Sequence, residues 1–244
     1  MRIYADLGVA HKEILRDIYK SDIQKSSRVQ GLDGLDLEMR EYFNYSYGVL
    51  KIPTGTQEIT KLAKGLGLIE DINVWEAWLE AELGLRLSDE PIYMDVAEPL
   101  HPALGNHKEG NHYGYTYQER MMGMIDIMFN HFIKSEDTRR AFWPIYHPTD
   151  AYRGVFPTRV PCTIGYHFKV NHGKMDVTLI SRSCDLDRFW ISDIYFARAI
   201  MEELLWRLDH MNIPEWIPGH VTPGITYHHV ISFHSFIGQD EVIF

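Results

Sequence analysis

The chain has 244 residues, of which 45% are hydrophobic and 24% are charged, a composition typical of a globular protein with a sizeable apolar core. Its formal net charge of −10 excludes the broad basic surface that binding to the phosphates of DNA or RNA requires. No apolar run has membrane-spanning length, and the first residues lack the order of a signal peptide, so we expect a cytoplasmic protein without a membrane partner.

The first half of the chain predicts mostly helices, because apolar residues recur there at helical spacing. The stretch "YQERMMGMIDIMFNHFIKS" has the length of a buried helix, and its methionines fit a protein core better than a cofactor site. We expect helices at residues 9–20 and 117–135. Two further helices should start at about Thr56 and at a cap formed by Asn73. In the stretch "GLDGLDLEMREYFNYSYG" we expect a loop and then a helix that starts at about Leu35.

The second half predicts strands, with one long helix at residues 192–210. The expected strands are residues 140–147, 160–170, 174–182 and 224–236. Two loops rich in Pro, Gly and His, at residues 97–112 and 213–224, fit the rim of an active site better than a domain boundary. We therefore expect a single domain over residues 1–244.

The stretch "VPCTIGYHFKVNHGKMDVTLISRSCD" is typical of two strands around a turn. Its Asn-His-Gly sequence favours a three-residue hairpin loop, because the last position of such a loop often needs positive φ. If Val170 then pairs with Lys174, Cys162 lies directly opposite Arg182, close enough for the guanidinium to favour the thiolate. A two-residue turn would instead pair Cys162 with Ser183.

Taken alone, Cys162 could be a small buried apolar side chain and Arg182 a charge at the end of a strand. The sequence Ser-Arg-Ser-Cys-Asp around the arginine adds two hydroxyls and a carboxylate, a set suited to binding an oxyanion such as phosphate. Cys184 would lie diagonal to Cys162, which makes a disulfide strained or absent. The two cysteines of the chain are therefore interpreted as thiols.

With these residues the sequence resembles the thymidylate synthase family, which includes the phage deoxycytidylate hydroxymethylases. The motifs that carry the resemblance are Pro-Cys at 161–162, Arg-Ser-Cys-Asp at 182–185, Asp-Thr-Arg-Arg at 137–140, His-Tyr-Gly-Tyr at 112–115 and Ser-Phe-His-Ser-Phe at 232–236. The resemblance implies an α+β thymidylate synthase-like fold, with a large mixed β-sheet covered by helices, in a homodimer packed through the sheets.

The family transfers a one-carbon unit from 5,10-methylenetetrahydrofolate to C5 of a pyrimidine nucleoside monophosphate. Cys162 matches the nucleophile, whose thiolate adds to C6 of the base and makes C5 reactive. Arg182 and Ser183 match groups that hold the nucleotide phosphate. Arg139 and Arg140 match a pair of arginines that reach the same phosphate from the other subunit.

Further residues match the family's cofactor and proton-transfer groups. Asp185 matches an aspartate at the cofactor face, and Tyr113 matches a tyrosine in the active-site water network. The family's catalytic glutamate lies on an early helix ahead of aromatic residues, where Glu41 fits best and Glu38 is the runner-up. Trp75 resembles a tryptophan that shields the folate, although a place in the helix core is the simpler interpretation.

The sugar and the phosphate loop have weaker matches. His234 resembles the histidine that contacts the sugar, but Phe236 replaces the family's tyrosine and leaves ribose and deoxyribose both open. Arg28 is the candidate for the phosphate-loop arginine. The adjacent His228 and His229 would point to opposite faces of a strand, so we expect no metal site.

The base preference depends on Asp193, eleven residues after Arg182, where thymidylate synthases have an asparagine. A carboxylate accepts hydrogen bonds, so it suits the exocyclic amine of cytosine and disfavours O4 of uracil. A second interpretation is that Asp193 favours the start of the following helix.

The chain also ends ten residues after His234, whereas family members continue further and close over the folate.

We therefore expect hydroxymethylation of a cytidylate, dCMP or CMP. The alternatives within the family are methylation of dCMP, and hydroxymethylation or methylation of dUMP. The alternative from another class is an inactive homologue that binds nucleotides.

Overall fold

The computed structural model describes residues 1–26, 37–88, 108–109, 112–113, 115–135, 137–153, 160–211 and 221–237, and the structural statements below concern that part of the chain. Its helices are α1 (Leu7–Ile18), α2 (Thr56–Gly65), α3 (Ile72–Leu87), α5 (Tyr117–Met121), α6 (Met124–Lys134), α7 (Pro148–Arg153) and α8 (Trp190–His210). Its strands are β1 (Arg2–Asp6), β2 (Ile23–Ser26), β3 (Leu37–Lys51), β4 (Lys108–Glu109), β5 (His112–Tyr113), β6 (Phe142–Pro144), β7 (Thr163–Asn171), β8 (Lys174–Asp185) and β9 (Thr222–Phe236).

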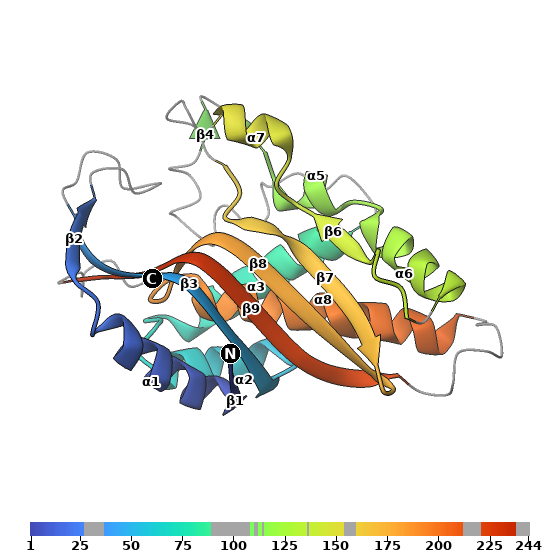
Figure 1. Ribbon diagram of the computed structural model, residues 1–244, viewed down its shortest axis with the longest axis horizontal. Helices are drawn as coiled ribbons and strands as arrows, with labels where there is room; N and C mark the ends of the chain where they lie inside the picture. The colour runs from blue at the N-terminus through green and yellow to red at the C-terminus, as the bar shows by residue number, and fades with distance from the viewer. Residues whose placement is uncertain are drawn as a thin grey trace.

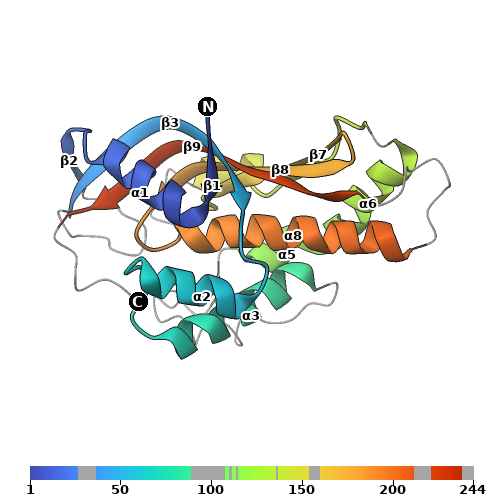
Figure 2. The ribbon, with the colours of Figure 1, turned by 90° about the horizontal axis from the view of Figure 1, so that it is seen from below.

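A seven-stranded mixed sheet forms one layer of the molecule, in the order β1-β3-β9-β8-β7-β6 with β2 paired to β3. Figure 1 shows β9, β8 and β7 running side by side across α8. Figure 2 shows α2, α3 and α8 together on one side of this sheet. The opposite face carries exposed apolar side chains such as Ile3 and Leu50, whose chain neighbours Tyr4 and Val49 are buried. No helix in the described ranges is long and apolar enough to cross a bilayer.

The helices expected near residues 9–20, Thr56 and Asn73 are confirmed as α1, α2 and α3. The cap of α3 differs, because the Asp71 side chain accepts hydrogen bonds from the backbone N–H groups of Asn73 and Val74. The methionine-rich segment forms two helices instead of one, since Gly123 takes a left-handed conformation (φ 71°) between α5 and α6.

The helix expected from about Leu35 is wrong, because residues 37–51 form strand β3. Tyr45, Tyr47 and Val49 are buried at a spacing of two residues, which is the period of a strand. β3 pairs with β1 on one side and with β9 on the other. These two partners stabilise aromatic and β-branched residues in a strand, so tertiary pairing overrides the local pattern.

The four strands and the long helix expected in the second half are confirmed as β6, β7, β8, β9 and α8. The loop of the β7–β8 hairpin is a correction. Asn171 pairs with Lys174, which leaves a two-residue turn in which His172 (φ 51°) and Gly173 (φ 71°) both have positive φ. Two-residue turns with positive φ at both positions match the twist of the flanking strands, which makes them the commonest hairpin connections.

The alternation of buried and exposed side chains breaks at one row of the sheet. On β8, Ser181 and Cys184 are both buried with two residues between them, and on β9 the same holds for Val230 and Phe233. These positions are in register, since Ser181 pairs with Val230 and Cys184 with Phe233. The break lets Cys184 join the core and leaves Arg182 and Ser183, between the two buried positions, partly exposed.

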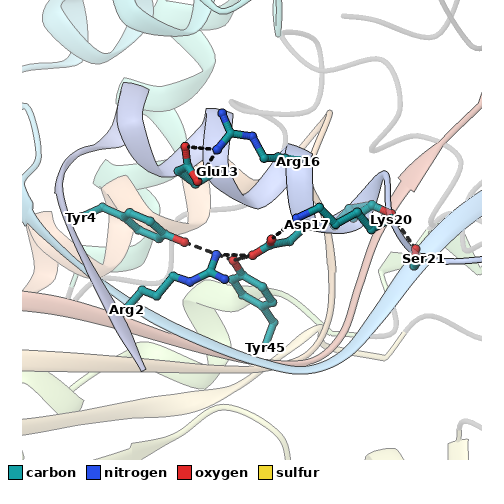
Figure 3. Close-up of polar contacts among 9 residues, drawn as sticks. Arg2, Tyr4, Glu13, Arg16, Asp17, Lys20, Ser21 and Tyr45 are labelled. Atoms are coloured by element: carbon teal, nitrogen blue, oxygen red, sulfur yellow. Dashed lines mark hydrogen bonds and ion pairs between the residues drawn. The ribbon is translucent and has the colours of Figure 1, made fainter.

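A polar cluster fastens the first helix to the edge of the sheet (Figure 3). The Arg2 side chain donates to the Asp17 carboxylate, which also accepts from the Tyr45 hydroxyl at 2.8 Å. The hydroxyls of Tyr4 and Tyr45 lie 3.2 Å apart. Because these residues come from β1, α1 and β3, the cluster fixes the N-terminal segment at the end of the sheet remote from β6.

A second buried chain of hydrogen bonds ties the start of α8 to the centre of the sheet. Trp190 Nε1 donates to the Tyr47 hydroxyl, which lies 2.9 Å from His228 Nδ1. His228 Nε2 lies 3.0 Å from Ser181 Oγ. Burial lowers the pKa of His228 to about 3, so the imidazole is neutral in the folded protein.

This neutral imidazole makes stability depend on pH. Unfolded histidine titrates near pH 6.5, so below that pH the unfolded chain binds a proton that folded His228 excludes, and stability is lost as the pH falls towards 3. Lowering the pH from 7 to 4.5 should reduce the unfolding free energy of the wild type through His228. In His228→Gln we expect this reduction to be smaller by about 2 to 3 kcal/mol. Urea unfolding at both pH values measures this difference. The exposed His210→Gln variant is the control, and an unchanged pH dependence in His228→Gln would contradict the assignment.

Candidate active site

Cys162 lies opposite Arg182 in the β7–β8 hairpin, as predicted, but for a different reason. The two-residue turn alone would pair Cys162 with Ser183. A register shift that begins at Thr163 moves the pairing by one residue, so that Thr163 pairs with Ser181. The backbone N–H of Arg182 then donates to the carbonyl oxygen of Cys162 at 2.8 Å.

The Arg182 side chain turns back along the segment that precedes Cys162. Its Nε donates to the carbonyl of Pro161 at 2.8 Å, and its Nη2 donates to the carbonyl of Val160 at 3.1 Å. The same Nη2 lies 3.8 Å from Cys162 Sγ. A guanidinium this close to a partly exposed sulfur stabilises the thiolate form.

The second cysteine has the opposite environment. Cys184 is 3% exposed, and burial raises the pKa of its thiol well above the ordinary value, with the charge of Asp193 adding to the shift. No disulfide joins Cys162 and Cys184. Of the two thiols, Cys162 has the access and the neighbouring cation that a nucleophile needs.

A buried ion pair on α3 contacts strand β7, the strand that follows Cys162. Arg86 and Glu82 are 4% and 6% exposed, and Arg86 Nε donates to Glu82 Oε1 at 2.8 Å. Arg86 Nη1 donates to the Tyr166 hydroxyl at 3.2 Å. Burial of both charges is tolerated because each has a partner of opposite sign and a further polar contact on the arginine.

Two aromatic rings contact the guanidinium of Arg86. The ring of Tyr117 lies 4.0 Å from it and the ring of Phe196 lies 4.2 Å away. The Tyr117 hydroxyl donates to Thr163 Oγ1 at 3.3 Å, which brings it next to Cys162. The charges of Asp193 and Cys162 both act on Tyr117. Cys162, Tyr117, Arg86 and the start of α8 therefore form one neighbourhood.

The sequence analysis missed Glu82 and Arg86. An acid and an arginine four residues apart on a helix are typical of a solvent-exposed pair. The signal that could have identified them is that both continue the buried stripe of Trp75, Trp78 and Leu79 along α3.

Asp193 lies in the first turn of α8, so its position also agrees with a favourable interaction with the helix dipole. Its carboxylate accepts no hydrogen bond from any described residue. Burial raises its pKa to about 7, while Arg86 opposes the shift and Glu82 adds to it. The carboxylate is thus poised between its neutral and ionised forms near neutral pH.

Asp185, expected at the cofactor face, is a buried carboxylate with several donors. The backbone N–H groups of Asp187 and Arg188 donate to Oδ1 at 3.0 and 3.2 Å, and the Arg188 side chain donates to Oδ2. Asp187 accepts from Ser235 Oγ at 2.8 Å. Burial raises the pKa of Asp187 to about 6, and the charge of Asp185 adds to that shift.

Glu41, His234 and Asp185 form one row across β3, β9 and β8. Glu41 pairs with His234, and His234 pairs with Asp185. The Ser232 hydroxyl donates to the Glu41 carboxylate. Burial lowers the pKa of His234, while Asp185 and Glu41 oppose the shift. The helix expected to carry Glu41 and Glu38 is a strand, so Glu41 reaches this row through sheet pairing.

Arg139 and Arg140 are exposed and remote from Cys162. The chain next to them binds β7 at Phe168, whose N–H donates to the carbonyl of Ala141. Phe168 is six residues along the strand from Cys162, a separation of roughly 20 Å. Within one chain the two arginines therefore do not join Arg182.

The remaining candidates are less informative. Trp75 is buried with its ring centroid 6.1 Å from that of Trp78, which agrees with a place in the helix core. Ser183 is partly exposed and pairs with Ser232 of β9. The backbone of Tyr113 lies in β5, but its side chain and the whole of Arg28 lie outside the described residues.

Comparisons with known proteins identify a family and a fold for the chain. The family model described as thymidylate synthase matches residues 48–188. Among solved structures, the chain is similar to a thermostable thymidylate synthase A from Bacillus subtilis, with a TM-score of 0.55 and 12% identity over 93% of this chain and 78% of that chain. This likeness confirms the expected α+β fold with a large mixed sheet and helices against it. No curated protein matches.

The environments of the two cysteines predict different reactivity. At neutral pH we expect iodoacetamide to label Cys162 at least about tenfold faster than Cys184, because only Cys162 combines exposure with a nearby guanidinium. Peptide mass spectrometry over a time course measures both rates in one sample. The Cys162→Ser variant, which leaves Cys184 alone, should label slowly. Equal rates would contradict the interpretation.

Proposed function

Because the chain belongs to the thymidylate synthase family, whose members transfer a one-carbon unit to C5 of a pyrimidine nucleotide, we propose that it carries out this transfer on a cytidylate. The proposed substrates are dCMP or CMP and 5,10-methylenetetrahydrofolate, and the proposed product is the 5-hydroxymethyl nucleotide. The observation that carries the proposal is Asp193, whose carboxylate lacks a described donor and shares the neighbourhood of Cys162.

The proposed reaction begins with covalent activation of the base. The Cys162 thiolate adds to C6, and the electron pair of the C5–C6 double bond moves to C5. Methylenetetrahydrofolate supplies a carbon at the oxidation level of formaldehyde, to which C5 bonds. After C5 has lost its proton, the bond between the transferred carbon and the folate nitrogen breaks, which releases tetrahydrofolate and leaves an exocyclic methylene on C5. Water then adds to the methylene carbon, and the C6–S bond breaks, which restores the C5–C6 double bond and returns the thiolate of Cys162.

Arg182 is the proposed phosphate ligand. Its Nε and Nη2 contact the carbonyls of Pro161 and Val160, so the side chain is held before a nucleotide arrives. A guanidinium is planar and matches the geometry of phosphate oxygens, so it suits a phosphate ligand. Ser183 would add a hydroxyl donor from the same strand. This arrangement would fix the nucleotide with C6 near Cys162.

Asp193 is the proposed determinant of base choice. An ionised carboxylate accepts from the exocyclic amine of cytosine and repels O4 of uracil. A protonated carboxyl can instead donate to O4. Because burial raises the pKa of Asp193 to about 7, discrimination against uridylate should increase as the pH rises through 7.

The other matched residues have proposed roles around the same nucleotide. Asp185 and Trp75 would face the folate, where a buried carboxylate and an indole suit a pterin ring. Glu41 and Tyr113 would relay protons through water, and His234 would contact the sugar. Water as the final acceptor gives hydroxymethyl instead of methyl.

A cytoplasmic location remains a prediction.

The substrate proposal is tested by offering CMP, dCMP, UMP and dUMP with methylenetetrahydrofolate and weighing the products. We expect a cytidylate to gain the mass of a hydroxymethyl group, and Asp193→Asn to shift preference towards uridylate by about tenfold or more, because an amide can donate to O4. Cys162→Ser should abolish product.

The alternatives give different masses in the same experiment. A methyl product identifies methylation of dCMP or dUMP, and modified uridylate with unmodified cytidylate overturns the role of Asp193. Binding without any product, and without a covalent adduct of Cys162 with a 5-fluoropyrimidine nucleotide, identifies an inactive homologue.

We further propose a homodimer in which each site borrows Arg139 and Arg140 from the other subunit. The bare face of the sheet, with Ile3 and Leu50 exposed, suits packing against a second copy of the same face. The segment that carries the two arginines contacts β7 at Phe168, roughly 20 Å along the strand from Cys162. In this proposal the two arginines therefore reach the phosphate of the other subunit.

Mixed dimers test the sharing of arginines. Cys162→Ser and the double variant Arg139→Ala/Arg140→Ala should each have little activity. Mixing them should restore about a quarter of wild-type activity, because half of the dimers are hybrids with one intact site. Mixing Cys162→Ser with Arg182→Gln is the control, which should stay inactive because both residues belong to the same subunit's site. No recovery in the first mixture would contradict sharing.

A further inference from the structure

The Arg86–Glu82 pair connects the two parts of the candidate site. On one side, Arg86 contacts the ring of Tyr117 at 4.0 Å, and Tyr117 is hydrogen-bonded to Thr163, the neighbour of Cys162. On the other side, Arg86 contacts Phe196 at 4.2 Å, one helical turn after Asp193. A change at Arg86 therefore reaches both the nucleophile's strand and the helix that carries the base-reading carboxylate.

Stability alone does not account for this pair. Buried ion pairs are often no more stabilising than apolar residues of the same shape, because the desolvation of two charges cancels much of their attraction. Here Arg86 and Glu82 occupy positions in an otherwise apolar stripe of α3. Two apolar side chains would fill that stripe without the desolvation cost, which suggests that the charges serve the site.

We propose that Arg86 is a positioning and specificity-determining residue, which with Glu82 balances the charge facing Asp193 and thereby sets how strongly the site discriminates cytidylate from uridylate. This inference rests on the proposed function, since it assigns a control to the same base-reading carboxylate.

The titratable and charged groups that interact electrostatically with Asp193 come from several elements. Besides Arg86 and Glu82 on α3, they are Tyr117 on α5, Tyr166 on β7, Cys184 on β8 and Tyr47 on β3. Burial raises the pKa of each of these tyrosines and of the cysteine, so all four are uncharged near pH 7. Within the described part of the chain, the charges that act on the Asp193 carboxylate are those of Arg86 and Glu82.

The two charges have opposite effects on Asp193. The cation of Arg86 lowers the pKa of Asp193 and the anion of Glu82 raises it. Removing Arg86 should therefore keep Asp193 protonated to a higher pH and relax discrimination against uridylate. Removing the charge of Glu82 should favour the ionised form and sharpen discrimination. Damage to the fold would not move the two variants in opposite directions.

The test compares Arg86→Gln and Glu82→Gln with the wild type. The first readout is the ratio of kcat/KM for cytidylate to that for uridylate between pH 5.5 and pH 8.5. We expect the midpoint of its pH dependence to move upward in Arg86→Gln and downward in Glu82→Gln. At pH 7 the ratio should fall in the first variant and rise in the second, by up to about tenfold when the midpoint moves by one pH unit.

The second readout does not need turnover. Infrared difference spectra between each protein and its Asp193→Asn counterpart report the protonated carboxyl of Asp193 as a function of pH. If no nucleotide is converted, the proposed function fails. The direction in which the midpoint of Asp193 protonation moves in the infrared spectra still decides whether Arg86 and Glu82 control that carboxyl group. Because Glu82→Gln keeps the size of the side chain, it provides this measurement even if Arg86→Gln does not fold.

The matched control is a second pair four residues apart on a helix. Arg207 Nε donates to Glu203 Oε1 at 2.8 Å near the other end of α8. We expect Arg207→Gln and Glu203→Gln to leave the midpoint of both readouts unchanged. Midpoints that stay fixed, or move in the same direction, in Arg86→Gln and Glu82→Gln would overturn the proposal.

Discussion

The hydrogen bonds from Arg182 to the carbonyls before Cys162 are the contacts on which the candidate site depends. They join the end of β8 to the chain that enters β7 and hold a positive charge beside the sulfur without any ligand. Hydrogen bonds from a charged donor are stronger than neutral ones. A site ordered in this way avoids part of the reorganisation that binding would otherwise require.

Two regions of the sheet have different electrostatic roles. At the β1 end, Arg2, Asp17 and Tyr45 form a cluster that anchors a helix. In the β8 region, burial shifts the pKa values of Asp187, Asp193, His234 and Cys184 away from their ordinary values. In the anchor, hydrogen bonding to Tyr4 raises the pKa of Arg2, and burial raises the pKa of Tyr45. The β8 region differs because it holds buried carboxyl groups with raised pKa values, which are typical of sites where a protein does chemistry.

The sequence predicted the elements that depend on local periodicity and missed those set by contacts between distant segments. Alternation identified β7, β8 and β9, and the expected hairpin placed Cys162 opposite Arg182, although with a turn one residue too long. The strand β3 could not be recognised, because its pairing with β1 and β9 overrides its local pattern. Arg86 and Glu82 were missed for the same reason, since only the packing of α3 against α8 and α5 reveals that they are buried.

The short turn of the β7–β8 hairpin and the register shift at Thr163 offset each other. The turn displaces the pairing of the two strands by one residue, and the shift displaces it back before Cys162. The position of the sulfur relative to Arg182 consequently depends on the turn and the register shift together. A residue inserted at that tip would displace Cys162 relative to Arg182 unless the irregularity near Thr163 changed as well.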